Sequence, residues 1–268
     1  MRKPFLIAGF TAISLGAAAI YWGQIIAPSV IAGYSDKVQV MLIPVISSEA
    51  RTQTGSQVNS GMTNSNIPKY SGQALGYLGD PKIIVNYPAE FINRYQAQLK
   101  NVVSLSLQYP NSEVYWIEAG IIKKQFDNYA GARDAWEYAR ILNPNNATAY
   151  YNLGNLYSLY LPDFSKAESN YQKSLLLDPY QSQTYLALAE FYKEFYKDKD
   201  YLAEAILLEG LRRMPNDLNL NLTLAVYYKS VGNKEGAIQY FEKFLKFPGL
   251  TGAQVDSVKK ELDQLRSS

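Results

Sequence analysis

The sequence predicts an all-α fold, in which an array of antiparallel helix pairs follows an N-terminal membrane helix. The array is indicated by prolines that recur at Pro110, Pro144, Pro179 and Pro215, with gaps of 34, 35 and 36 residues. Each proline follows a stretch in which apolar residues have helical spacing. The membrane helix is indicated by an uncharged, mainly apolar run over residues 4–35, longer than the roughly 20 residues that cross a bilayer as a helix.

The composition argues against a nucleic-acid-binding protein and against most catalytic sites. The chain has 26 basic and 24 acidic residues, and Arg2 and Lys3 supply the net charge of +2. A nucleic-acid-binding protein usually carries a basic face instead. The chain also has no cysteine and no histidine, which removes thiol nucleophiles, thiolate metal sites and the commonest general acid/base. We therefore expect no enzyme, no catalytic residue, no metal site and no cofactor.

Residues 1–35 are expected to form a signal anchor that crosses the membrane once. Tyr21 and Trp22 suit the far headgroup region. Because Arg2 and Lys3 favour the cytoplasmic side, the N-terminus is expected in the cytoplasm and the repeats outside it. A single-pass membrane protein is therefore predicted.

Two further readings of this segment remain open. The alanines 17–19 fit the cleavage site of a signal peptide, in which case the protein is secreted. The apolar run continues well past these alanines, which favours the uncleaved anchor. In addition, Gly9, Gly16 and Gly23 recur every seven residues, and such a stripe can let two membrane helices associate.

Residues 36–88 are expected to form an extended and largely flexible linker. Residues 47–66 are rich in Ser, Thr, Gly, Asn and Gln, a composition that cannot bury enough apolar area to offset the entropy of ordering. Residues 67–88 carry several turn signals, and the sequence assigns them no role. The pattern becomes helical from Ala89, and residues 89–112 form a half-repeat.

Equivalent positions in successive units carry the same kinds of residue. Two helices of a unit cannot bury their apolar faces alone, and stacking on neighbouring units completes the core. The positions are a small residue on the first helix (Gly120, Gly154, Ala189, Ala225), a small residue on the second helix (Ala132, Ala167, Ala203, Ala237), a large residue four positions later (Trp136, Tyr171, Leu207, Phe241), and an opening aromatic (Trp116, Tyr150, Tyr185). Asn221 replaces the aromatic in the fourth unit.

This pattern resembles the tetratricopeptide repeat (TPR) family over about residues 89–266. The resemblance implies a right-handed TPR superhelix of antiparallel helix pairs. Its four units are expected to cover residues 113–251, as residues 113–146, 147–181, 182–217 and 218–251. Residues 252–268 are expected to form a capping helix, because Thr251 and Gln254 match a capping box.

In the TPR family, the first helices of the units line a groove that binds extended or helical peptides. The resemblance therefore implies a peptide groove along these helices in this chain. The groove positions are expected to be Tyr151, Asn152, Asn155, Gln183, Glu190, Lys193, Asn219, Thr223 and Lys229. The alternative is that these residues form a polar face that contacts only solvent. Some family members bind the C-terminal carboxylate of a partner through basic residues of these helices. In this chain, Ile117 and Ala187 occupy positions where Lys or Arg would be needed for such binding. We therefore expect no such clamp.

The leading functional hypothesis is a membrane-tethered TPR adaptor or scaffold that binds a protein or peptide partner in its groove. This architecture is similar to bacterial envelope proteins with one anchor and a TPR domain, some of which act in envelope or secretion complexes. A second hypothesis is a structural subunit of a membrane complex that docks by the edges of the array. A third is a hydrolase that uses paired carboxylates, although no cluster of acids stands out from the solvated helix faces.

Overall fold

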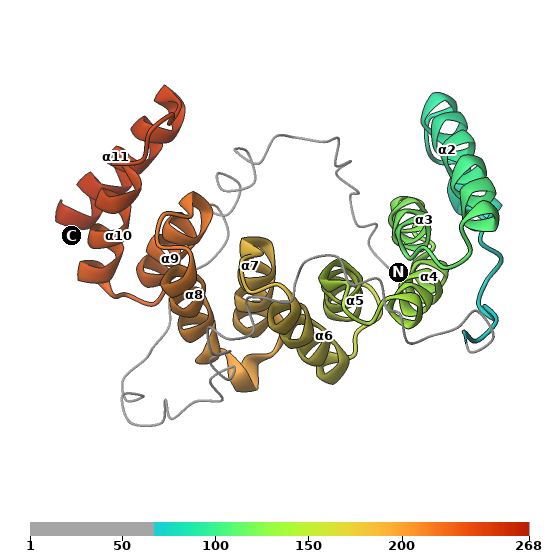
Figure 1. The fold of residues 1–268 in the computed structure, drawn as a ribbon. Helices are drawn as coiled ribbons and strands as arrows, with labels where there is room; N and C mark the ends of the chain where they lie inside the picture. Colours follow the sequence, from blue (N-terminus) through green and yellow to red (C-terminus); the bar gives the residue numbers. More distant parts are fainter. Residues whose placement is uncertain (1–66, 268) are drawn as a thin grey trace, which may run out of the picture. The chain divides into compact units, whose positions relative to one another are not determined.

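The computed structural model describes residues 67–267, which are helical with connecting turns and contain no strand (Figure 1). The predicted all-α class is therefore confirmed for this part of the chain. The predicted membrane helix over residues 1–35, with Gly9, Gly16 and Gly23, lies outside the described residues. Within residues 67–267, none of the helices is long and apolar enough to cross a bilayer.

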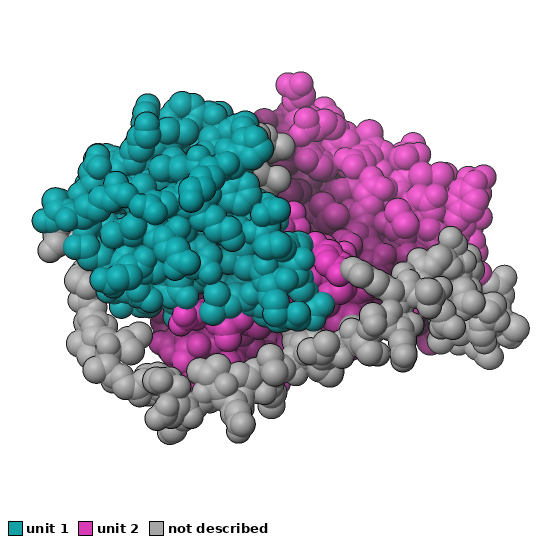
Figure 2. Space-filling view, turned by 60° about the vertical axis from the view of Figure 1, so that its left-hand side comes forward, with its two compact units in different colours: residues 1–38, 207–268 teal, residues 39–206 magenta. Residues whose placement is uncertain are grey.

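The described residues divide into two compact units, residues 67–206 and residues 207–267 (Figure 2). In chain order we call them the first unit, which is magenta and labelled unit 2 in Figure 2, and the second unit, which is teal and labelled unit 1 there. The helices of the first unit are α1 (Pro81–Ile84), α2 (Ala89–Gln108), α3 (Val114–Gln125), α4 (Tyr129–Leu142), α5 (Ala147–Leu159), α6 (Phe164–Leu177), α7 (Ser182–Glu190), the π-helical turn η3 (Phe191–Phe195) and the 3₁₀ turn η4 (Lys197–Lys199). The division falls inside α8 (Leu202–Arg213), and α9 (Leu218–Ser230), α10 (Lys234–Phe244) and α11 (Gly252–Ser267) follow.

Asparagine and aspartate side chains begin many of these helices. The Asn146 carboxamide oxygen accepts hydrogen bonds from the backbone N–H groups of Thr148 and Ala149 at the start of α5. Asn128, Asp163, Asp217 and Asn233 cap α4, α6, α9 and α10 in the same way. Such a cap satisfies backbone donors that the helix leaves unpaired and contributes about 1 kcal/mol.

Within a helix pair, a glycine of the first helix faces a large aromatic ring of the second. A Cβ atom at Gly120 would lie 2.3 Å from Nε1 of Trp136, and one at Gly154 would lie 2.7 Å from Cδ1 of Tyr171. Both rings are almost fully buried. The Trp136 indole also donates a hydrogen bond of 3.1 Å to the Ile117 carbonyl. The predicted small and large positions therefore meet in α3–α4 and in α5–α6.

Residues 67–88 do not form a repeat helix, but they pack against α2 and α3. Leu78 joins a buried apolar cluster to which α2 contributes Leu99 and Val102, and to which Ile122 and Phe126 also belong. Residues 67–88 belong to the predicted linker over residues 36–88, and the sequence did not predict their packing. These residues therefore cover part of the apolar face of α2.

The second unit ends in α11, which packs on α10. Val258 and Leu262 of α11 are buried. The predicted capping box is present, since the Thr251 N–H donates to Oε1 of Gln254 at 2.9 Å and the Gln254 N–H donates to Oγ1 of Thr251 at 3.3 Å. Arg266 forms an ion pair with Glu242 of α10 at 2.6 Å. The helix therefore covers the apolar surface that α10 presents at the end of the array.

The close approach at Gly154 predicts a stability effect. Gly154→Ala is expected to lower the free energy of unfolding by about 1–3 kcal/mol, because the new methyl group would overlap the Tyr171 ring in a packed core. Urea unfolding followed by circular dichroism measures this change. Gly252→Ala is the control, because nothing lies within 4 Å of its added Cβ. Equal stability of the two variants would contradict the proposed packing constraint.

Candidate functional site

In the first unit, α3, α5 and α7 lie on one side and α4 and α6 on the other (Figure 1). We call the solvent-facing side chains of α3, α5, α7 and η3 the inner face. Tyr151, Asn152 and Asn155 of α5 and Lys193 of η3 are half-buried, whereas Gln183 and Glu190 of α7 are exposed. These six predicted groove residues therefore belong to one compact unit. The other three, Asn219, Thr223 and Lys229, lie on α9 of the second unit.

Asn155 and Asn152 differ in how their amide groups are used. The Asn155 Nδ2 group donates to the Tyr151 carbonyl at 3.1 Å, and its Oδ1 accepts from the Tyr171 hydroxyl at 3.1 Å. By contrast, Nδ2 of Asn152 is buried and has no hydrogen-bond partner among residues 67–267. An unsatisfied buried donor is costly, and a partner that supplied a carbonyl oxygen would remove that cost. Of the two asparagines, Asn152 is therefore the one whose Nδ2 group is unused within the protein; this atom is closed to solvent, so a ligand reaches it only if the half-buried side chain turns outward.

Tyr151, Tyr171 and Glu190 lie close enough to influence one another. Burial raises the pKa of Tyr171, and the charges of Tyr151 and Glu190 add to the rise, whereas a hydrogen bond with Ser158 opposes it. The Glu190 side chain contacts solvent, but the protein around it displaces part of its hydration, which raises its pKa. The Glu194 carboxylate adds to this rise and Lys193 opposes it. The inner face therefore holds a carboxylate that lacks full compensation.

The two lysines predicted for the groove both take part in ion pairs. Lys193 lies 3.4 Å from Oε1 of Glu194, next to it in η3. Lys229 of α9 forms an ion pair with Glu261 of α11. The Lys229 side chain therefore links the last repeat to the capping helix, and reversing its charge would disturb this contact as well as any ligand site.

The α3–α4 pair holds an extended segment of the same chain, which the sequence did not predict as a site. Lys123 is fully buried, and its ammonium group donates to the carbonyls of Ala74 at 2.9 Å and Tyr77 at 2.6 Å. The Asn128 amide donates to the Leu78 carbonyl at 3.2 Å and to Oε1 of Gln73 at 2.6 Å. We call residues 70–78 the docked segment.

An aromatic contact and a carboxylate hold the start of the docked segment. The Tyr70 ring packs against both Trp116 and Tyr138, with ring centroids 4.5 Å and 5.3 Å away, and these two rings also contact each other. The backbone N–H of Gln73 donates to Oδ2 of Asp134 at 3.0 Å. No sequence signal distinguishes these helix residues from an ordinary solvated or core position, because their partners are 46 to 61 residues away along the chain.

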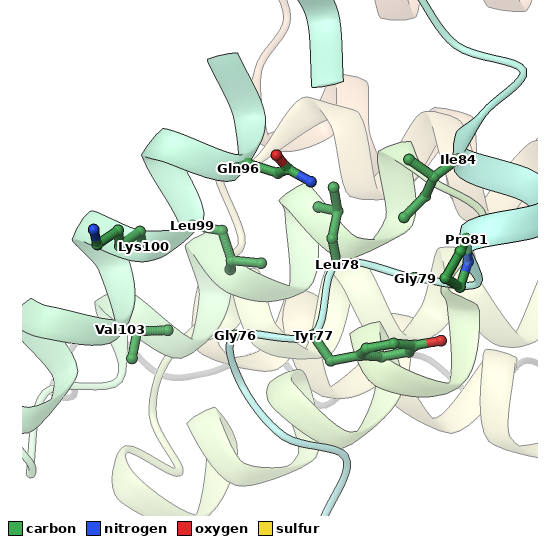
Figure 3. A pocket seen from close by; sticks show the side chains of 10 residues that line it. All are labelled: Gly76, Tyr77, Leu78, Gly79, Pro81, Ile84, Gln96, Leu99, Lys100 and Val103. Atoms are coloured by element: carbon green, nitrogen blue, oxygen red, sulfur yellow. The ribbon is translucent and has the colours of Figure 1, made fainter. Parts of the chain in front are cut away.

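A pocket of about 450 Å³ lies between residues 76–84 and α2 (Figure 3). Its lining is mainly apolar, with Leu78 and Ile84 on one side and Leu99 and Val103 on the other. Gln96 and Lys100 of α2 are the polar side chains beside it. Nothing in the described residues identifies a ligand for it. Groups of three or more acidic side chains that could hold a metal ion are absent from residues 67–267.

Lys123 predicts a pH dependence of stability. Burial lowers its pKa from 10.5 to about 8, with Asp134 opposing the change. Above pH 8 the unfolded chain therefore binds a proton that the folded chain has released, so stability rises with pH. From pH 8.0 to 9.5, Lys123 is expected to add roughly 1–2 kcal/mol to the free energy of unfolding. This range stops below pH 10, where tyrosines with raised pKa values, such as Tyr70, begin to act in the opposite direction.

Urea unfolding at pH 8.0 and 9.5 measures this gain. Lys123→Met is expected to leave only the part of the gain that comes from Lys124, whose pKa burial also lowers. Lys100→Met, which removes an exposed lysine of α2, is expected to keep the whole gain. A gain of the same size in Lys123→Met would show that other groups cause it.

Comparison with known proteins supports the resemblance seen in the sequence. The family model described as tetratricopeptide repeat matches residues 147–181 and residues 218–247. The first match spans α5 and α6, and the second spans α9 and α10. No curated protein matches the chain significantly. The chain therefore carries tetratricopeptide repeats in these two segments, one in each compact unit.

Proposed function

We propose that the protein is an adaptor that binds an extended segment of another protein across its inner face. The observation that carries this proposal is the buried Asn152 amide group, which has no partner among the described residues. Tetratricopeptide repeats generally mediate contacts between proteins, and a backbone carbonyl of a bound segment would satisfy this donor without demanding a particular sequence. Tyr151, the preceding residue of α5, is half-buried and offers its hydroxyl as a second group that a ligand could use.

The proposal includes a membrane tether through residues 1–35, with the repeats outside the cytoplasm. Its support is the length of the uncharged run over residues 4–35 and the position of Arg2 and Lys3 before it. Such a tether would hold the adaptor at the membrane and suits a role in assembling an envelope or secretion complex. Self-association through Gly9, Gly16 and Gly23 is compatible with it.

Docking by an edge of the array is a second candidate function, favoured by one observation. The pocket between residues 76–84 and α2 lies beside exposed apolar side chains, among them Tyr77 and Val85. Hydrogen exchange on a complex separates the two functions. Protection of residues 76–103 would indicate edge docking, whereas protection of α5 and α7 would indicate binding to the inner face.

A photo-reactive amino acid in place of Asn152 is expected to crosslink the partner in intact membranes. The same amino acid in place of Ser165, which is exposed on α6, is the control and is expected to give no such product. Equal products from both positions, or none from position 152, would contradict binding to the inner face.

Asn152→Ala is expected to weaken binding of the captured partner by about three- to tenfold, the worth of one hydrogen bond. The fold should be unaffected, because Nδ2 of Asn152 has no partner to lose. Asn155→Ala is the matched comparison. It removes the hydrogen bonds to Tyr151 and Tyr171 and is therefore expected to lower the melting temperature as well. Unchanged binding by Asn152→Ala at equal stability would count against the proposal.

The absence of native cysteines allows a direct test of topology. Ser257→Cys places a single thiol on an exposed position of α11. In intact cells, a maleimide reagent that does not cross the inner membrane is expected to label this thiol. Labelling only after that membrane is permeabilised would place the repeats in the cytoplasm and overturn the proposed orientation.

A further inference from the structure

Equivalent positions on the three first helices of the first unit change in character from α3 to α7. Ile121, Asn155 and Glu190 each follow the small residue of their helix directly. Ile121 is 41% exposed, Asn155 is satisfied within the protein, and Glu190 is an exposed acid. Along this row the inner face is therefore apolar at α3, polar at α5 and acidic at α7.

The α3 end of the row offers apolar contact area. Val114 lies two turns before Ile121 on the same helix and is 54% exposed. Between them, the Glu118 carboxylate accepts a hydrogen bond of 2.9 Å from Gln98 of α2, so that this charge already has a polar partner. A bound segment would gain most at this end by burying an apolar side chain against Ile121.

The α7 end of the row offers a carboxylate whose charge is poorly compensated. Glu194 has Lys193 at 3.4 Å and Lys197 at 3.9 Å. Glu190 is exposed and has no ion pair or hydrogen bond among the described residues. Burial of its surroundings and the Glu194 carboxylate raise its pKa, and Lys193 offsets only part of this rise. A cation held beside Glu190 would relieve this cost, whereas a second anion would increase it.

On these grounds we propose that the inner face selects an extended protein segment with an apolar side chain at Ile121 and a lysine or arginine side chain at Glu190. This inference rests on the proposed function, and it names the chemistry of the partner. The Asn152 amide between the two ends binds a backbone carbonyl of the segment and fixes its path.

The geometry also sets the spacing of the two side chains in the partner. Neighbouring helices lie roughly 10 Å apart, so the path from α3 to α7 is on the order of 20 Å. An extended chain advances about 3.3 Å per residue, which places roughly six residues between the apolar and the basic position. A partner selected in this way differs from the acidic C-terminal peptides that a basic clamp would bind.

A selection from random peptides tests the proposal. A phage library of 12-residue peptides is panned against the full chain in lipid nanodiscs, in parallel with Glu190→Lys and Glu235→Lys. Glu235 is an exposed acid of α10 and provides the same change of charge outside the inner face. Peptides with Lys or Arg about six positions from an apolar residue are expected from wild type and from Glu235→Lys. These peptides should bind Glu190→Lys at least about tenfold more weakly, because an attractive charge pair becomes a repulsive one.

The outcomes separate this inference from the proposed function. Enriched peptides without a preference for basic residues, or with the same preference for Glu190→Lys, would overturn the inference and leave binding at the inner face intact. No enrichment from wild type would also overturn it, and the crosslinks from position 152 would then decide whether the inner face binds a partner at all. Loss of basic peptides in Glu235→Lys as well would assign the preference to overall charge and would overturn the inference.

Discussion

In the helix pairs α3–α4 and α5–α6, the contact between a glycine of the first helix and a large ring of the second is the constraint on which the inner face depends. At Gly154 there is no room for a methyl group, because the Tyr171 ring occupies that space. Once the ring lies there, its hydroxyl reaches Asn155 and Ser158 of the first helix. The core contact thus also settles which polar groups of α5 are used within the protein and which remain for a ligand. Packing and binding capacity are therefore not independent properties in this array.

The sequence predicted the helix pairs because their determinants are local or periodic. Small and large positions recur at a fixed interval, and capping residues such as Asn146 lie next to the helices they begin. Which polar groups of the candidate site are already hydrogen-bonded within the protein could not be predicted in the same way. The repeat register places Asn152 and Asn155 on one helix face, but only the position of Tyr171 shows that Asn155 is already satisfied. Which hydrogen bonds form depends on three-dimensional neighbours that the register does not specify.

The docked segment, residues 70–78, illustrates the same limit over a longer range. A lysine buried without partners would be strongly destabilising, and carbonyl oxygens of the segment supply those partners to Lys123. Neither side of this contact has a recognisable pattern in the sequence. The docked segment resembles a linker, and the helix that carries Lys123 resembles an ordinary repeat helix. The contact covers the α3–α4 pair with the protein's own chain. These polar groups of the α3–α4 pair are therefore already bound by the protein's own chain and are not available to a protein partner.

Ion pairs within the protein determine which charged side chains of the first helices remain without a partner of opposite charge. Lys193 and Lys229 occupy equivalent positions, each eight residues after the opening position of its helix. Both cations are matched by acids, Lys193 by its neighbour Glu194 and Lys229 by Glu261 of the capping helix. A count of charges along the first helices would therefore overestimate their basic character. Glu190 has no ion pair among the described residues, so that α7 presents an acid without a matched cation even though the whole chain is slightly basic.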